Sequence, residues 1–120
     1  MPKPASVANG ATFDLVAIDR EMRAESAYER SGHTARTLVR TPDLRVVLVV
    51  MRTGSRIAEH HANETAAIHV LSGQVRVKLP SRTVELRSGQ LLVLESGLRH
   101  DVEAPEDSAF VLTLGWPGGS

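Results

Sequence analysis

One stretch decides the fold of this chain: Gly89-Gln-Leu-Leu-Val-Leu-Glu-Ser-Gly97-Leu-Arg-His100. A glycine, an apolar run, a second glycine and a histidine follow one another. An earlier stretch repeats the pattern, from Gly54 through the adjacent His60 and His61 to Gly73. A short apolar run between glycine-containing turns is typical of a β-strand. The two stretches therefore predict a small β-barrel in which histidines from distant parts of the chain meet.

The residues on either side predict a single all-β domain with one short helix at its start. The chain has 120 residues, which is the length of one domain. Apolar residues recur at helical spacing from Leu15 to Ala27, with Asp14 or Asp19 as the N-cap and Gly32 as the helix end. We expect four segments along the chain: a flexible N-terminal arm (1–12), a helical segment (13–33), the barrel (34–116) and a tail (117–120).

After the helical segment the apolar pattern has a period of two residues, as in β-strands. Arg45 to Met51 is a continuous β-branched run, which indicates a strand covered on both faces. In Gln74 to Leu79 the pattern directs Val75 and Val77 inward and the intervening basic residues to water. Short strands between glycine turns predict an antiparallel sandwich or barrel. Strands are expected at 36–40, 45–51, 66–71, 74–79, 83–86, 91–94, 100–103 and 109–114.

The composition limits the classes of function. The 14 basic and 14 acidic residues cancel, so no bulk charge favours nucleic acid or an anionic membrane as a partner. The absence of cysteine excludes disulfides and thiolate metal sites, and it fits a cytoplasmic protein. Residues 1–6 lack the apolar core of a signal peptide, and the run from Val46 to Met51 is too short to span a bilayer. We therefore expect a cytoplasmic protein that binds neither nucleic acid nor a membrane.

Histidines are the candidate functional residues, because imidazole is the commonest transition-metal ligand in proteins. Adjacent residues of a regular strand point to opposite faces, so His60 and His61 cannot both face inward. The most economical site combines His100 with His60. Glu59 and His61, which share the other face, are the second choice, and a register slip of one residue would exchange the two sets.

Other polar residues are interpreted as structural. His33 follows the expected helix end and is taken as a surface or satisfied core residue. His69 alternates with apolar neighbours, which places it on a sheet surface or at a subunit contact. Arg99 is interpreted either as a solvent-facing turn residue or as a guide for anions at the barrel mouth. A solvated loop is expected to hold the acidic residues Asp101, Glu103, Glu106 and Asp107.

The glycine and histidine spacing resembles the second motif of the cupin family. That motif reads glycine, five residues, proline, one residue, glycine, two residues, histidine, three residues, asparagine. Gly89, Gly97 and His100 stand at matching places, whereas Glu95 replaces the proline and Ala104 the asparagine.

The first cupin motif is matched in part. It runs from a glycine across five residues to His-x-His, and then to a glutamate that six residues separate from a closing glycine. Gly54, His60 and Gly73 match, whereas Ala62 replaces the second histidine and Ala66 the glutamate. The resemblance covers about residues 34–116, and the flanking sequence is similar to small single-domain bacterial cupins (the cupin type-2 conserved barrel family) without an assigned reaction.

The resemblance implies an antiparallel cupin barrel (a double-stranded β-helix, or jelly roll), commonly a homodimer, with its pocket inside. It carries over two metal ligands, His60 and His100, for an ion such as Fe, Mn, Ni or Zn. The favoured function is binding of a small molecule in the pocket, with a divalent metal held weakly. The alternatives are a metal-dependent enzyme of dioxygenase or isomerase type on a small organic substrate, and a filled barrel that acts through dimerisation. No residue stands out as catalytic.

Overall fold

The computed structural model describes residues 3–60 and 63–115, with the backbone alone at 59 and 60. Two helices precede the strands within these ranges: α1 (Leu15–Arg23) and α2 (Ser26–Ser31). The strands are β1 (His33–Arg40), β2 (Leu44–Met51), β3 (Arg56–His60), β4 (Thr65–Ser72), β5 (Gln74–Lys78), β6 (Thr83–Arg87), β7 (Leu91–Leu94), β8 (His100–Glu103) and β9 (Ser108–Gly115).

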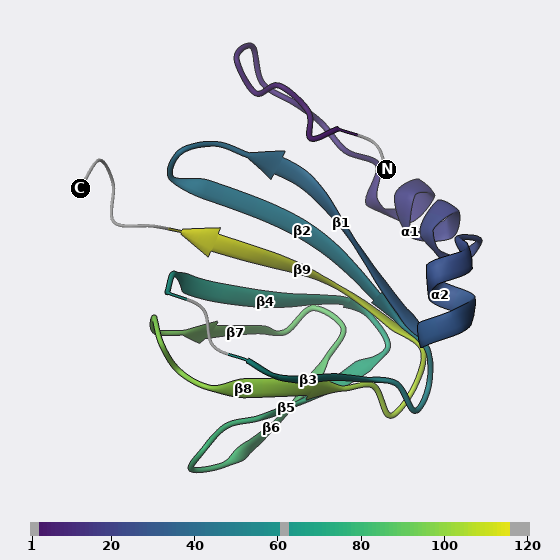
Figure 1. Cartoon of the computed structure of the whole chain (residues 1–120), viewed down its shortest axis with the longest axis vertical. Helices are drawn as coiled ribbons and strands as arrows, with labels where there is room; N and C mark the ends of the chain where they lie inside the picture. Colours follow the sequence, from purple (N-terminus) through teal and green to yellow (C-terminus); the bar gives the residue numbers. More distant parts are fainter. Residues whose placement is uncertain (1–2, 61–62, 116–120) are drawn as a thin grey trace.

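The strands form two antiparallel sheets that face each other (Figure 1). One sheet has the order β1-β2-β9-β4-β7, and the other has the order β3-β8-β5-β6. Strands distant in sequence are therefore neighbours, as in a jelly roll. This arrangement confirms the predicted all-β class with a short helical segment at its start.

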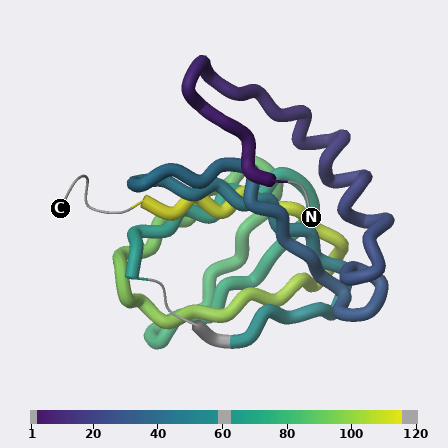
Figure 2. Tube along the Cα trace, turned by 45° about the horizontal axis from the view of Figure 1, so that its top comes forward, coloured from purple at the N-terminus to yellow at the C-terminus, as the bar shows by residue number. Residues whose placement is uncertain are grey.

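The helical segment differs from the prediction in one respect, because it consists of two short helices. Asp14 is the N-cap of α1, and its Oδ1 accepts a hydrogen bond from the amide of Ala17 at 3.1 Å. The extended conformation of Glu25 (φ −75°, ψ 146°) then interrupts the helix. Gly32 ends α2 in the left-handed conformation (φ 78°), as predicted. Both helices lie on the outer side of the five-stranded sheet, over β1 and β2 (Figure 2).

Strand β2 is buried on both faces, as its continuous apolar run predicts. Val47 and Val49 belong to the core between the two sheets. Leu48 and Val50 belong to a second core, between the five-stranded sheet and the helices. Val75 and Val77, at the predicted inward positions, face the first core and are fully buried.

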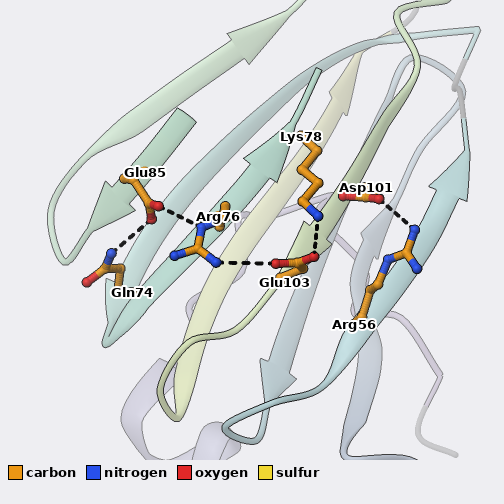
Figure 3. A network of polar contacts seen from close by, with 7 residues as sticks. All are labelled: Arg56, Gln74, Arg76, Lys78, Glu85, Asp101 and Glu103. Atoms are coloured by element: carbon orange, nitrogen blue, oxygen red, sulfur yellow. Dashed lines mark hydrogen bonds and ion pairs between the residues drawn. The ribbon is translucent and has the colours of Figure 1, made fainter. Parts of the chain in front are cut away.

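Strand β3 was not predicted. The strand expected at 100–103 is present as β8, so Asp101 and Glu103 lie in a strand and not in the solvated loop expected for the acidic run, whereas Glu106 and Asp107 do lie in an exposed loop. Asp101 and Glu103 point to the outer face of the four-stranded sheet, where basic residues from neighbouring strands bind them (Figure 3). Asp101 Oδ2 is 2.8 Å from an Arg56 guanidinium nitrogen, and Glu103 Oε1 is 2.7 Å from Lys78 Nζ. The outer face of this sheet is thus a ladder of ion pairs.

Candidate functional site

A cavity of about 320 Å³ lies between the two sheets. Its wall comes from six strands, β1, β2, β3, β4, β8 and β9. Most of the lining is aliphatic or aromatic, three side chains are basic, and none of the described lining residues is acidic. The lining residues are His33, Ala35, Thr37, Arg45, Val47, Val49, Ile57, Ile68, His100, Val102, Phe110 and Leu112.

His100, the first residue of β8, is the predicted site residue that the described structure places in this wall. The residue is 4% exposed, and its Nδ1 lies 3.0 Å from the carbonyl oxygen of Leu98. A carbonyl oxygen only accepts hydrogen bonds, so Nδ1 is the donor in this contact. The imidazole is therefore oriented by the backbone just after the turn at Ser96 and Gly97.

The other predicted metal ligands are placed in part. His60 is the direct partner of His100 in the ladder between β3 and β8, so the two backbones are neighbours. The side chains of His60 and Glu59 and the whole of His61 lie outside the described residues. The site that combines these residues with His100 stays a prediction.

Two basic residues of the cavity were not identified from the sequence as functional. The interpretation of His33 as a surface or satisfied core residue is wrong, because its Nδ1 is buried in the cavity wall and has no hydrogen-bond partner. Arg45 on β2 has a buried Nε that also lacks a partner. The sequence does contain a signal for Arg45. Arg45 is separated from Val47 and Val49 by an even number of strand positions, so its side chain shares their inward face.

The strand register places Arg45 and His33 toward opposite ends of the wall. Arg45 is paired with Leu114, and Leu114 in turn with Ala66, so Arg45 and Ala66 are two strands apart, about 10 Å across the sheet. His33 is paired with Met51, six residues along β2 from Arg45, which corresponds to about 20 Å along the strand. Ala66 is the position at which the cupin motif has glutamate, and here it is a buried core residue.

The charges of the lining favour an anion over a cation. A guanidinium is positively charged at physiological pH, so Arg45 repels a divalent metal ion in the same low-dielectric cavity. The part of the chain that the structure describes contains no group of three or more His, Asp or Glu side chains arranged to hold a metal ion. The described lining thus combines a mostly apolar wall with the positive charge of Arg45.

Neither helix within the described ranges is long and apolar enough to cross a bilayer. His69 is exposed on the outer face of β4, as predicted. Leu91 and Val93 of the neighbouring β7 are also exposed, at 60% and 59%.

Comparison with known proteins identifies relatives of this fold. Residues 47–115 match the model of the Cupin domain family. A conserved protein of unknown function from Streptococcus pyogenes superposes with a TM-score of 0.76 and 24% identity, covering 99% of this chain and 98% of that protein. KdgF from Halomonas sp. superposes with a TM-score of 0.64 and 26% identity, covering 70% and 80% of the two chains.

A larger enzyme contains a similar barrel. A variant of salicylate 1,2-dioxygenase from Pseudoaminobacter salicylatoxidans has a TM-score of 0.76 and 19% identity over 86% of this chain, which spans 34% of the enzyme. No curated protein sequence matches the chain significantly.

Proposed function

Because the chain belongs to the cupin family, we propose that it binds a small organic molecule inside its barrel. The observation that carries this proposal is the cavity between the sheets, whose volume of about 320 Å³ is within the usual range of ligand sites. Its lining is mostly apolar, with a few polar groups that can orient a ligand. Ala35 lines the cavity and is also exposed, so the cavity opens to solvent at β1.

Narrowing this opening tests the proposal. We would screen a library of small organic fragments against ¹⁵N-labelled protein by NMR, and repeat the screen with Ala35→Leu. The added side chain enters the cavity mouth, so fragments that shift the amide signals of Val47 and Val49 should lose their affinity. Ala67→Leu is the matched control, since Ala67 is also a strand residue of the five-stranded sheet but lies outside the cavity lining. Fragments that bind both variants as tightly as the natural protein would refute binding inside the barrel.

A divalent ion at His60 and His100 is a second candidate, and a metal-dependent dioxygenase or isomerase would require it. The direct pairing of the two residues and the contact of His100 Nδ1 with the Leu98 carbonyl, which orients the ring, support it. Ala66 supplies no carboxylate, and Arg45 adds repulsion, so we expect weak binding that is easily lost on dialysis. Calorimetric titration of Zn²⁺ and Mn²⁺ into the metal-free natural protein and into His60→Ala and His100→Ala decides this. Absence of binding to the natural protein, or equal affinity in all three proteins, excludes the candidate.

We also propose that the protein is a homodimer. The exposed apolar side chains of Leu91 and Val93 on β7, beside His69 on β4, support a contact at this outer face. Sedimentation velocity of the natural protein and of Val93→Asp tests the proposal. A monomer at all concentrations would contradict it, and a dimer that the substitution leaves intact would exclude this face.

A further inference from the structure

We propose that the ligand of the barrel is a small organic anion, a monocarboxylate with an apolar body, and that Arg45 binds its carboxylate. This inference rests on the proposed binding function and adds the chemical class of the ligand. Its starting point is an arginine in a cavity wall with nothing to pair with.

The first argument is the missing partner of Arg45. Its Nε is buried, and no described residue gives it a hydrogen bond or an ion pair. Arg45 as a whole is half-buried, and a guanidinium that is partly shielded from water is stabilised by an anionic partner. Arg36 also has a buried Nε without a partner, but its terminal nitrogens bind Glu21 at 3.2 Å and Glu25 at 2.8 Å. No such ion pair is present for Arg45 among the described residues.

The second argument is the composition of the cavity. The described lining contains no carboxylate that a conformational change could bring to Arg45. His33 lies about 20 Å away along the sheet, too far to hold the same group. Arg45 is thus the permanently charged cation among the described lining residues at its end of the wall. The planar guanidinium matches a carboxylate, because it can donate two parallel hydrogen bonds.

The third argument concerns the remainder of the ligand. Val47 and Val49 follow Arg45 along the inward face of β2, and Phe110 and Leu112 lie beside them on β9. This wall offers dispersion contacts and excludes water, but it has few hydrogen-bonding groups. A ligand that carries its charge at one end and a hydrocarbon chain or ring at the other satisfies both parts of the wall.

Three probes of one shape separate charge from size: hexanoate, hexanamide and hexylammonium. Each is titrated into the ¹⁵N-labelled full-length protein, and the shifts of the Val47 and Val49 amides report binding in the cavity. We expect hexanoate to bind at least about tenfold more tightly than hexanamide, the factor that a hydrogen-bonded charge typically provides. Hexylammonium should not bind.

The variants assign the effect to one residue. Arg45→Met keeps most of the side-chain length, and it should reduce hexanoate binding to the level of hexanamide. Arg82→Met is the matched control, because Arg82 is exposed between β5 and β6, lies outside the cavity lining, and its replacement removes the same charge. It should leave both affinities unchanged. If Arg45→Met alters the amide spectrum beyond the cavity, Arg45→Gln provides the same comparison.

The outcomes for ligand class and for binding itself are distinct. Equal affinity of hexanoate and hexanamide, or unchanged hexanoate affinity in the Arg45 variant, overturns the carboxylate inference and leaves small-molecule binding in place. An equal loss in the Arg82 and Arg45 variants also overturns it, since the effect is then one of net charge. Absence of hexanoate binding overturns the inference as well, while the fragment screen with Ala35→Leu separately decides whether the barrel binds any ligand.

Discussion

Replacement of Gly73 by alanine should destabilise the barrel far more than the same replacement of Gly89. Both glycines are in the left-handed region, with φ of 74° and 87°, where any other residue is strained. Their surroundings differ. A Cβ at Gly89 would have no neighbour within 4 Å, whereas a Cβ at Gly73 would overlap the carbonyl oxygen of Asp107 and lie 2.9 Å from Ser108 Cα. These are backbone atoms, which cannot rotate away.

The expected losses of stability combine the strain of the left-handed backbone with the steric overlap of the added Cβ. A left-handed alanine costs about 1–2 kcal/mol, and the reduced entropy of the unfolded chain returns about 0.4–1 kcal/mol. Gly89→Ala should therefore lower the free energy of unfolding by about 1 kcal/mol. At Gly73 the overlap forces a backbone shift, for which overpacking provides a scale of about 1–3 kcal/mol more. The total of about 2–4 kcal/mol is a large fraction of the stability of a domain this size.

Urea unfolding of the natural protein and both variants, followed by circular dichroism, measures these differences. The backbone overlap at Gly73 predicts that Gly73→Ala loses at least about twice as much unfolding free energy as Gly89→Ala, and this result would support the steric reasoning. Equal losses would show that the approach of Asp107 to this turn is not a tight constraint, and that only the sign of φ matters at both sites.

Two further predictions concern the side opposite the cavity and the turn that follows β2. Met22→Ala, at a fully buried position between α1 and the sheet, should lower the free energy of unfolding by about 2–5 kcal/mol, and Val16→Ala at a 70% exposed position should have little effect; similar losses in urea unfolding would contradict this packing. The backbone and side-chain hydrogen bonds from Thr53 lower the pKa of Asp107. Its contribution to stability is therefore present above the ordinary aspartate pKa of about 4 and is lost as the pH falls through the lowered pKa. The melting temperature of Asp107→Asn should approach that of the natural protein as the pH falls from 7 to 3, and a constant difference would refute the assignment.

Local patterns in the sequence predicted most of the fold, because strand alternation and turn glycines are local features. The expected glycine turns are present at Gly54, Gly73, Gly89 and Gly97, and the structure shows all four in the left-handed conformation. Strand β3 was missed because its sequence, Arg56-Ile-Ala-Glu-His, has no clear alternation. Its strand conformation depends on pairing with β8, about forty residues away, which no local pattern reveals.

The candidate site was less predictable, for a related reason. His100 could be found because the glycine before it and the spacing to the next motif residues are local. Arg45 and His33 belong to the cavity through the register of three strands, and that register arises from non-local pairing. A single charged residue at the start of an apolar run also resembles an ordinary strand end. A cavity residue differs from an ordinary strand end only if the inward face of the strand is buried at that position.

The two cores of this barrel have different roles: one holds β2 against the helices, and the other includes residues that line the cavity. Leu48 and Val50 anchor β2 to the helices from outside, so the position of the strand depends little on what occupies the cavity. The inward residues of the same strand are then free to determine which ligand fits, within a wall that is already held in place. Replacing the motif glutamate by Ala66 removes a negative charge from this wall, and Arg45, two strands away, adds a positive one. If Arg45 binds a carboxylate as proposed, these two side chains would account for a preference for an anion over a metal cation, while the backbone that carries them keeps the cupin arrangement.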